Sequence, residues 1–188
     1  MRKTVGILSP HQNLSSDTLF HFTDNIKTLL LIIENGFQVR YIYEKLPKVR
    51  IGYLVNTVCF CDIPLGAVKY HLNWYGDYGI GISRQFAKEL GISPVHYIHS
   101  QSPHIIYSKS QSNIERLRQS IITPYLKQIR GKQIFYNEKT KKPYWKWKKF
   151  YEEREWRYLS KDSDLHIRTY KTEVELDNER RSEENTSE

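Results

Sequence analysis

The sequence predicts a single α+β domain, and three observations point to this class. Helical and extended patterns follow one another in irregular order, without the regular strand–helix repeat of a doubly wound sheet. The extended runs are short and aromatic, in a chain with 14 Tyr, 7 Phe and 4 Trp among 188 residues. No internal repeat or low-complexity linker divides the chain, whose length is typical of one domain.

The first part of the chain predicts two strands and two helices. An aromatic strand is expected over residues 18–23, and the polar residues 23–25 suit the N-cap of a helix that ends at Gly36. A β-rich strand over 56–62 precedes a short helix over 65–72, which Pro64 opens. The first helix is expected to place four apolar side chains on one face: Ile26, Leu29, Leu30 and Ile33.

The second part predicts three strands and two helices. A glycine-punctuated strand over 75–83 leads to a helix over 84–90 with Ser83 as its cap. A strand is expected over 94–98. Apolar and basic residues then alternate at helical spacing over 113–128, and the last strand is expected over 150–159.

Charge is distributed unevenly along the chain. The formal net charge is +8, while the last 18 residues hold three basic and seven acidic residues. The segment 178–188 contains no apolar residue, so we expect a disordered acidic tail over 171–188 behind a domain formed by 1–170. The remaining 170 residues carry +12, a field that favours polyanions.

Composition favours a cytoplasmic protein with no membrane-spanning segment. The longest apolar run, Leu29 to Ile33, is far shorter than a membrane helix, and the stretch after the first basic residues is too short for a signal peptide. Cys59 and Cys61 share one face of a strand, and their spacing with the histidines fits no standard zinc site. We therefore expect small core cysteines, a reducing compartment and no metal.

Two segments allow both a structural and a functional interpretation. His21 is either a polar residue of an edge strand or a hydrogen-bonding group at a strand end, where binding residues collect. The glycines of residues 75–81 either relieve crowding in an aromatic strand or let a flat ligand approach the backbone. The pattern is neither GxGxxG nor a P-loop, so it carries no nucleotide-binding fingerprint.

The segment 152–157 is charged where a strand should be half apolar. Alternation places Glu153, Glu155 and Arg157 on one face. Adjacent carboxylates on a strand repel each other unless cations or a substrate lie between them. The segment is therefore either a solvated charge ladder on an edge strand or a carboxylate pair that binds a substrate hydroxyl.

A basic and aromatic stretch precedes this segment. Residues 109–157 hold fourteen basic and five acidic residues, and rings alternate with lysines over 139–149. Cations for phosphates and rings for bases are the composition of a nucleic-acid surface, although a solvated basic face or a site for an acidic protein has the same composition. The candidate phosphate-binding residues are Lys141, Lys142, Lys146 and Lys148.

Five segments together resemble abortive phage infection proteins of the AbiGi type. They are FHFT (20–23), VCFCDIPL (58–65), HLNWYGDYGIGIS (71–83), GISPVHYI (91–98) and YEEREWRY (151–158). The resemblance implies a cytoplasmic bacterial or phage-borne protein of a toxin–antitoxin-like defence operon, in which such proteins are labelled antitoxins.

A more distant resemblance is to ADP-ribosyltransferases, through a His on the first strand, a Tyr on a middle strand, a Glu on a late strand, and the Glu-Arg-Glu of residues 153–155. It implies split antiparallel sheets with flanking helices and NAD as substrate. Glu155 would stabilise the oxocarbenium that forms as nicotinamide leaves, and Glu153 would orient the acceptor. The residues implied for NAD are His21 on the ribose, Tyr78 or Tyr75 on the nicotinamide, and Thr23 nearby.

Two functions follow as alternatives. The first is a transferase that moves ADP-ribose from NAD to nucleic acid or to a protein bound to it. The family's Ser-Thr-Ser stretch and its second Tyr are missing here. This leaves the second function open, a non-catalytic antitoxin or regulator that binds RNA, DNA or a cognate toxin. A cleft shared by His21, Tyr78 and Glu155 would favour the enzyme, and a buried ion pair between Glu155 and Arg157 or Arg84 would favour the binding protein.

Overall fold

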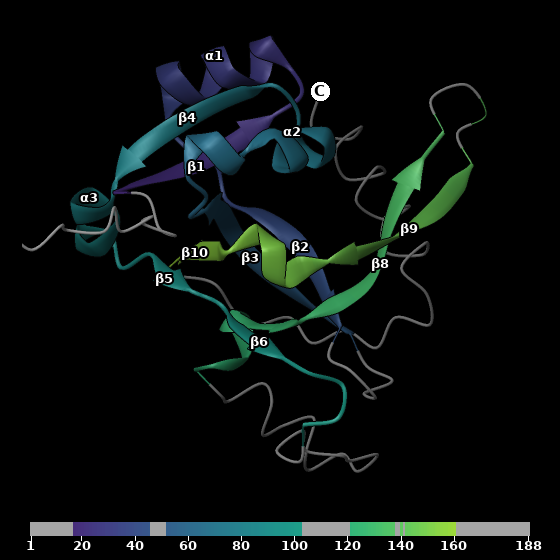
Figure 1. Ribbon diagram of the computed structural model, residues 1–188. Coiled ribbons are helices and arrows are strands. Elements are labelled where there is room, and N and C mark those ends of the chain that lie inside the picture. Colours follow the sequence, from purple (N-terminus) through teal and green to yellow (C-terminus); the bar gives the residue numbers. More distant parts are fainter. Residues whose placement is uncertain (1–16, 46–51, 103–120, 138–139, 141, 161–188) are drawn as a thin grey trace, which may run out of the picture.

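The computed structural model describes residues 17–45, 52–102, 121–137, 140 and 142–160 (Figure 1). The tail expected over 171–188 lies outside these residues. In chain order the elements are β1 (Thr18–Thr23), α1 (Ile26–Asn35), β2 (Arg40–Lys45), β3 (Gly52–Cys61), α2 (Lys69–Tyr75), β4 (Tyr78–Ser83), α3 (Arg84–Glu89), β5 (Ser93–Pro94), β6 (His96–Ile98), β7 (Leu126–Gln128), β8 (Arg130–Tyr136), β9 (Pro143–Lys149) and β10 (Glu155–Leu159), with 3₁₀ turns at Leu65–Ala67, Thr123–Tyr125 and Phe150–Glu153.

A six-stranded antiparallel sheet dominates the described part of the chain. Its strands run in the order β4-β1-β3-β10-β5, and β2 also pairs with β3. Thr57 of β3 faces Arg40 of β2 on one edge and Leu159 of β10 on the other, while Cys61 faces both Phe20 and Glu155. Strands β1 and β2 therefore share one edge of the long strand β3, and β10 occupies the other edge.

The two faces of this sheet differ in chemistry. One face carries an apolar core of five buried residues with Phe37, Val39 and Trp156 packed against it: Leu19, Val58, Phe60, Ala87 and Ile92. Because side chains alternate along a strand, Cys59 of β3 points to the opposite face. There it meets the carboxylate of Glu155. The second face is thus buried but polar, and it holds the candidate site.

The local patterns predicted the first helix and its neighbours well. Asn25 caps α1 by accepting from the backbone N–H of Lys27, and Ser83 caps α3 by accepting from that of Phe86. Helix α1 ends at Gly36, as the sequence predicts. Its apolar face is nevertheless not buried, because Ile26, Leu30 and Ile33 remain exposed.

The helix expected over 113–128 is wrong in its last part, and residues 113–120 lie outside the described ones. Residues 123–125 form a 3₁₀ turn containing Pro124, which has no backbone N–H to continue a helical ladder. Strand β7 follows and pairs in parallel with β6, and the Tyr53 hydroxyl donates to the carbonyl of Leu126 at 2.8 Å. Tertiary contacts therefore override the helical periodicity of this stretch.

The last predicted strand is confirmed only in its second half. Residues 150–153 form a 3₁₀ turn, Arg154 adopts the left-handed region at φ 46°, and β10 begins at Glu155. Strand β10 lies between β3 and β5, so it is no solvated edge strand. The α+β class is confirmed, while the transferase-like split of the sheets stays a prediction.

Candidate functional site

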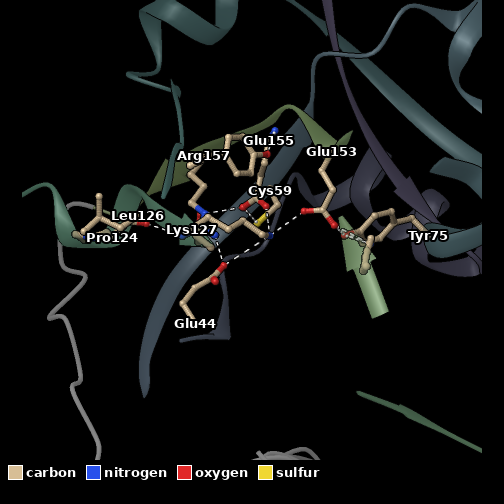
Figure 2. A network of polar contacts seen from close by, with 12 residues as sticks. Glu44, Cys59, Tyr75, Pro124, Leu126, Lys127, Glu153, Glu155 and Arg157 are labelled. Carbon is tan, nitrogen blue, oxygen red and sulfur yellow. Dashed lines mark hydrogen bonds and ion pairs between the residues drawn. The ribbon is translucent and has the colours of Figure 1, made fainter. Parts of the chain in front are cut away.

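A buried network of acids and bases lies on the polar face of the sheet (Figure 2). Seven elements contribute to it, which is why no short motif reveals it. Its members are Glu44 of β2, Cys59 of β3, Tyr75 of α2, Lys127 of β7, Lys148 of β9, Glu153 of the last 3₁₀ turn, and Glu155 and Arg157 of β10. We call this set the ionic network.

Glu155 and Arg157 form the centre of the ionic network. Arg157 is 0% exposed and Glu155 5% exposed. The guanidinium donates from Nε to Glu155 Oε1 at 2.5 Å and from Nη1 to the carbonyl of Pro124 at 2.6 Å, and its Nη2 pairs with Glu44. The Cys59 thiol donates to the same Glu155 oxygen at 3.2 Å. Each of the three nitrogens of this guanidinium thus has a hydrogen-bond acceptor.

Lys127 links the three carboxylates of the ionic network. Its ammonium pairs with Glu155, lies 2.8 Å from Glu153 Oε2 and lies 3.6 Å from Glu44 Oε1. Figure 2 shows its side chain running between these carboxylates. Lys127 also lies over the ring of Phe150, 5.0 Å from its centroid. Together these contacts fix β7 against the sheet.

Glu153 connects this centre to α2 and to the β8–β9 hairpin. Tyr75 donates its hydroxyl proton to Glu153 Oε1, and Lys148 lies 2.6 Å from the same oxygen. Lys148 also donates to the Tyr75 hydroxyl at 2.8 Å and lies over the rings of Trp74 and Tyr75. Lys148 is therefore a buried cation enclosed by an acid and two rings.

Charges in the ionic network hold one another in their ionised forms. Burial opposes the charge of Glu155, but Arg157 and Lys127 hold its pKa well below the usual range. Burial likewise opposes the charge of Lys127, whose pKa Glu153, Glu155 and Glu44 raise. For Lys148 burial prevails over Glu153, and its pKa is lowered. Three carboxylates and three cations of the described residues thus balance inside the protein.

His71 of α2 lies beside the ionic network and is kept neutral. Its ring packs between Phe22 and Tyr75, with centroids 5.3 and 4.5 Å away. Burial lowers the pKa of His71 to about 4, although Glu153 opposes the shift. In the unfolded chain the pKa of a histidine is about 6.5. Between these values the unfolded chain binds a proton that the folded chain does not, so the free energy of unfolding falls as the pH drops.

We expect His71→Phe to remove this acid sensitivity. The difference in melting temperature, variant minus unaltered chain, should rise as the pH falls from 6.5 to about 4 and then level off. Thermal melts at pH 7.5, 5.5 and 4.5 measure it. His96→Phe, which replaces an imidazole at an exposed position of β6, is the matched control and is melted at the same three pH values. A constant difference for His71→Phe would mean that this imidazole is not held neutral.

The structure separates the residues that the transferase resemblance assigns to NAD. His21 donates from Nδ1 to the carbonyl of Cys59 at 2.8 Å, and its ring contacts Phe37 and Phe60 of the apolar face. Thr23 and Tyr78 face each other across β1 and β4, and alternation puts them on the side of His21. Glu153, Glu155 and Tyr75 meet on the opposite face. The sheet itself therefore stands between the two groups.

The glycines of β4 make room for aromatic rings. Gly79 faces Phe22 and Gly81 faces Phe20. A Cβ at Gly79 would lie 2.7 Å from a ring carbon of Phe22, and one at Gly81 would lie 3.1 Å from a ring carbon of Phe20. This favours the structural interpretation of the segment. Tyr75 is not on this strand, because α2 extends to it and Gly76 ends the helix.

The cysteines behave as core residues of β3. Both are free thiols, and Cys61 is buried. Burial raises the pKa of Cys61 to about 12 and that of Cys59 well above its usual value, so both remain protonated. Among the described residues no group of three potential metal ligands comes together. No helix in the same part of the chain is long and apolar enough to cross a membrane.

The predicted phosphate-binding lysines need a correction. Lys148 is 3% exposed and paired with Glu153, so it is not available to a phosphate. Lys146 and Lys142 are exposed, and Lys141 lies outside the described residues. The error arises because Lys148 packs over Trp74 and Tyr75 of α2 and reaches Glu153, contacts that the run of lysines and rings in the sequence does not reveal.

Sequence reasoning also missed two members of the ionic network, Glu44 and Lys127. Glu44 lies in a strand that the sequence did not predict, and Lys127 lies in the supposed helix. The signal that was available is the buried charge of β10, because Glu155 and Arg157 on one face of an interior strand require partners from other elements.

Comparison with known proteins identifies related sequences. A family described as "Putative abortive phage resistance protein AbiGi, antitoxin" matches residues 50–187. A curated relative, "Abortive phage resistance protein AbiGi" of Lactococcus lactis subsp. cremoris, is 25% identical over 159 residues. That alignment spans 66% of this chain and 61% of the relative. No solved structure matches the chain.

Proposed function

The chain belongs to the AbiGi family, and from this premise we propose that it is an abortive-infection antitoxin that binds a cognate toxin in the cytoplasm. The description of the family supplies both the phage-resistance role and the antitoxin role. The name of the curated relative repeats the first of them. An antitoxin is defined by the toxin that it counteracts, so the implied partner is a protein.

One observation favours binding over ADP-ribose transfer, namely the position of Glu155. A transferase needs a carboxylate that reaches the ribose 2′-hydroxyl and the developing oxocarbenium. Here one carboxylate oxygen accepts from Arg157 and Cys59, and the other pairs with Lys127. Both oxygens are thus occupied in a buried site, as expected for a structural ion pair.

We expect this chain to relieve growth arrest caused by its cognate toxin, taken as the product of the gene adjacent to its own. The two proteins would be expressed from separate inducible promoters, and colony counts compared with and without the chain. Relief should follow the amount of folded chain and should accompany co-purification of the two proteins. Growth arrest that persists at a tenfold excess of the folded chain would overturn the antitoxin proposal.

The same preparation tests the competing function. A calorimetric titration with NAD up to millimolar concentration should show no saturable binding. In a separate assay, labelled ADP-ribose should not pass from NAD to RNA, DNA or lysate protein. His21→Ala serves as the control, because a true NAD site would lose affinity in this variant. Saturable binding that His21→Ala abolishes would restore the transferase function.

A further inference from the structure

The β8–β9 hairpin projects beyond the sheet and has two unlike faces. In Figure 1 it extends to the right, away from α3 at the left. Strand β8 pairs with β9 in a continuous antiparallel register from Arg130 opposite Lys149 to Tyr136 opposite Pro143. Residues of even number in β8 therefore share a face with those of odd number in β9. We call this face the outer face of the hairpin.

The inner face of the hairpin anchors it to the domain. Lys148 enters the ionic network, and Phe135 packs against Trp74 of α2 with centroids 5.5 Å apart. Tyr144 stacks on Phe135, and Lys146 lies over both rings. These contacts use the inner face and leave the outer face toward solvent.

The outer face combines exposed tryptophans with cations. Trp147 is 69% exposed and Trp145 48% exposed, values unusual for the largest apolar side chain. Lys132 stands opposite Trp147, with its ammonium 5.8 Å from the ring centroid, and Arg130 stands opposite Lys149. The two strands contain five basic residues and no acidic one. At the Lys149 end of the hairpin, Lys149 forms an exposed ion pair with Glu152 at 3.0 Å.

We propose that the outer face of the hairpin binds single-stranded nucleic acid. Two residues along a strand span roughly 6.8 Å, about twice the spacing of stacked bases, so each tryptophan can take a base of its own. Arg130, Lys132 and Lys149 lie opposite and beyond Trp147, where the phosphates of such a strand would run. Bases in a duplex are stacked on one another and offer no face to a ring, so the partner is an unpaired strand.

The composition of the outer face also separates nucleic acid from other partners. Cations gather around one of the two tryptophans, since Lys132 lies opposite Trp147 and Arg130 opposite Lys149, whereas Ile134 lies opposite Trp145. An apolar protein partner would not be matched by this cluster of cations. An acidic protein would be matched by cations alone and would not require exposed indoles. Two neighbouring rings with cations at one end fit a ligand that offers both flat bases and phosphates.

The test is a titration of fluorescein-labelled dT12 and rU12 with the full chain, followed by anisotropy. We expect binding at 50 mM NaCl, with a slope of log affinity against log salt of about −2 for three phosphate contacts. Trp147→Ala and Trp145→Ala should each weaken binding about 5- to 150-fold. Lys132→Gln should reduce the salt slope by about 0.7.

Two control variants retain the fold and leave the outer face intact. Lys146→Gln removes a cation from the inner face, and Phe86→Ala removes an exposed ring from α3. Each should leave the affinity for dT12 within about twofold. The circular dichroism spectrum of every variant would be recorded first, so that a loss of binding is not a loss of structure.

Three results would overturn the proposal. The first is no binding of either oligonucleotide at 50 mM NaCl. The second is that Lys146→Gln and Trp147→Ala weaken the binding of dT12 equally, which would indicate that net charge alone determines the affinity. The third is an affinity for a labelled duplex equal to the affinity for dT12. If Trp147→Ala keeps its affinity for dT12 but no longer relieves the toxin, the outer face binds protein instead. The titration contains no toxin, so its failure leaves the antitoxin proposal standing.

Discussion

Glu155→Gln should destabilise the domain by about 3–5 kcal/mol, since it leaves two buried cations with one carboxylate fewer. Arg157 would keep Glu44 and the carbonyl of Pro124, and Lys127 would keep Glu153 and Glu44. The variant side chain has nearly the same volume, so the loss reports charge and not packing. Urea unfolding, followed by circular dichroism and tryptophan fluorescence, measures it.

Glu152→Gln is the matched control for this variant. Glu152 pairs with Lys149 at 3.0 Å, and both side chains are exposed. An exposed pair contributes about 0–1 kcal/mol, so the control should unfold near the midpoint of the unaltered chain. A second variant, Glu155→Gln combined with Lys127→Met, restores the balance of charge and should recover part of the loss. A Glu155→Gln protein as stable as the unaltered chain would show that this carboxylate does not stabilise the fold.

Lys148→Glu should unfold the domain or cost more than about 4 kcal/mol, whereas Lys146→Glu should cost less than about 1 kcal/mol. The two lysines are two residues apart on the inner face of β9, but only Lys148 enters the ionic network. Its replacement would bring a carboxylate against Glu153 in a buried site, where like charges repel strongly. Thermal melts by circular dichroism compare the two variants directly.

A milder variant keeps this expectation testable if Lys148→Glu does not fold. Lys148→Met removes the cation but leaves Glu153 with Lys127 and the Tyr75 hydroxyl, so a loss of about 1–3 kcal/mol is expected. Equal melting temperatures for Lys148→Glu and Lys146→Glu would show that Lys148 is hydrated. In that case the original assignment of Lys148 to phosphate binding would regain support.

Short-range patterns predicted the elements that are stabilised locally. The caps Asn25 and Ser83 and the terminal Gly36 mark helix ends through contacts with residues two to four positions away. Such contacts are visible in the sequence because they involve neighbouring positions. Strand β1 and the charged face of β10 were predicted for the same reason, since alternation is also local.

Elements that depend on distant partners could not be predicted in this way. Strand β7 is defined by β6 and by Tyr53, which is 73 residues from its partner Leu126. The lysine pattern of β9 likewise gave no sign that Lys148 is buried, because its partner Glu153 is brought to it by the 3₁₀ turn that follows the strand. The burial of Lys148 could be recognised only from the three-dimensional position of Glu153.

The residues of the ionic network lie far apart in the sequence, and this has a consequence during protein synthesis. Glu44 and Arg157 are 113 residues apart, and Thr57 of β3 donates to the carbonyl of Tyr158, 101 residues away. Until β10 leaves the ribosome, β3 lacks its neighbour on one edge, and Glu44 and Lys127 lack the arginine and the acid that balance them. A strand edge left open attracts other chains, and an incompletely paired nascent chain is accessible to proteases. Contacts of such long range also fold slowly, in milliseconds to seconds. The cellular supply of this protein should therefore depend on how often translation proceeds through β10.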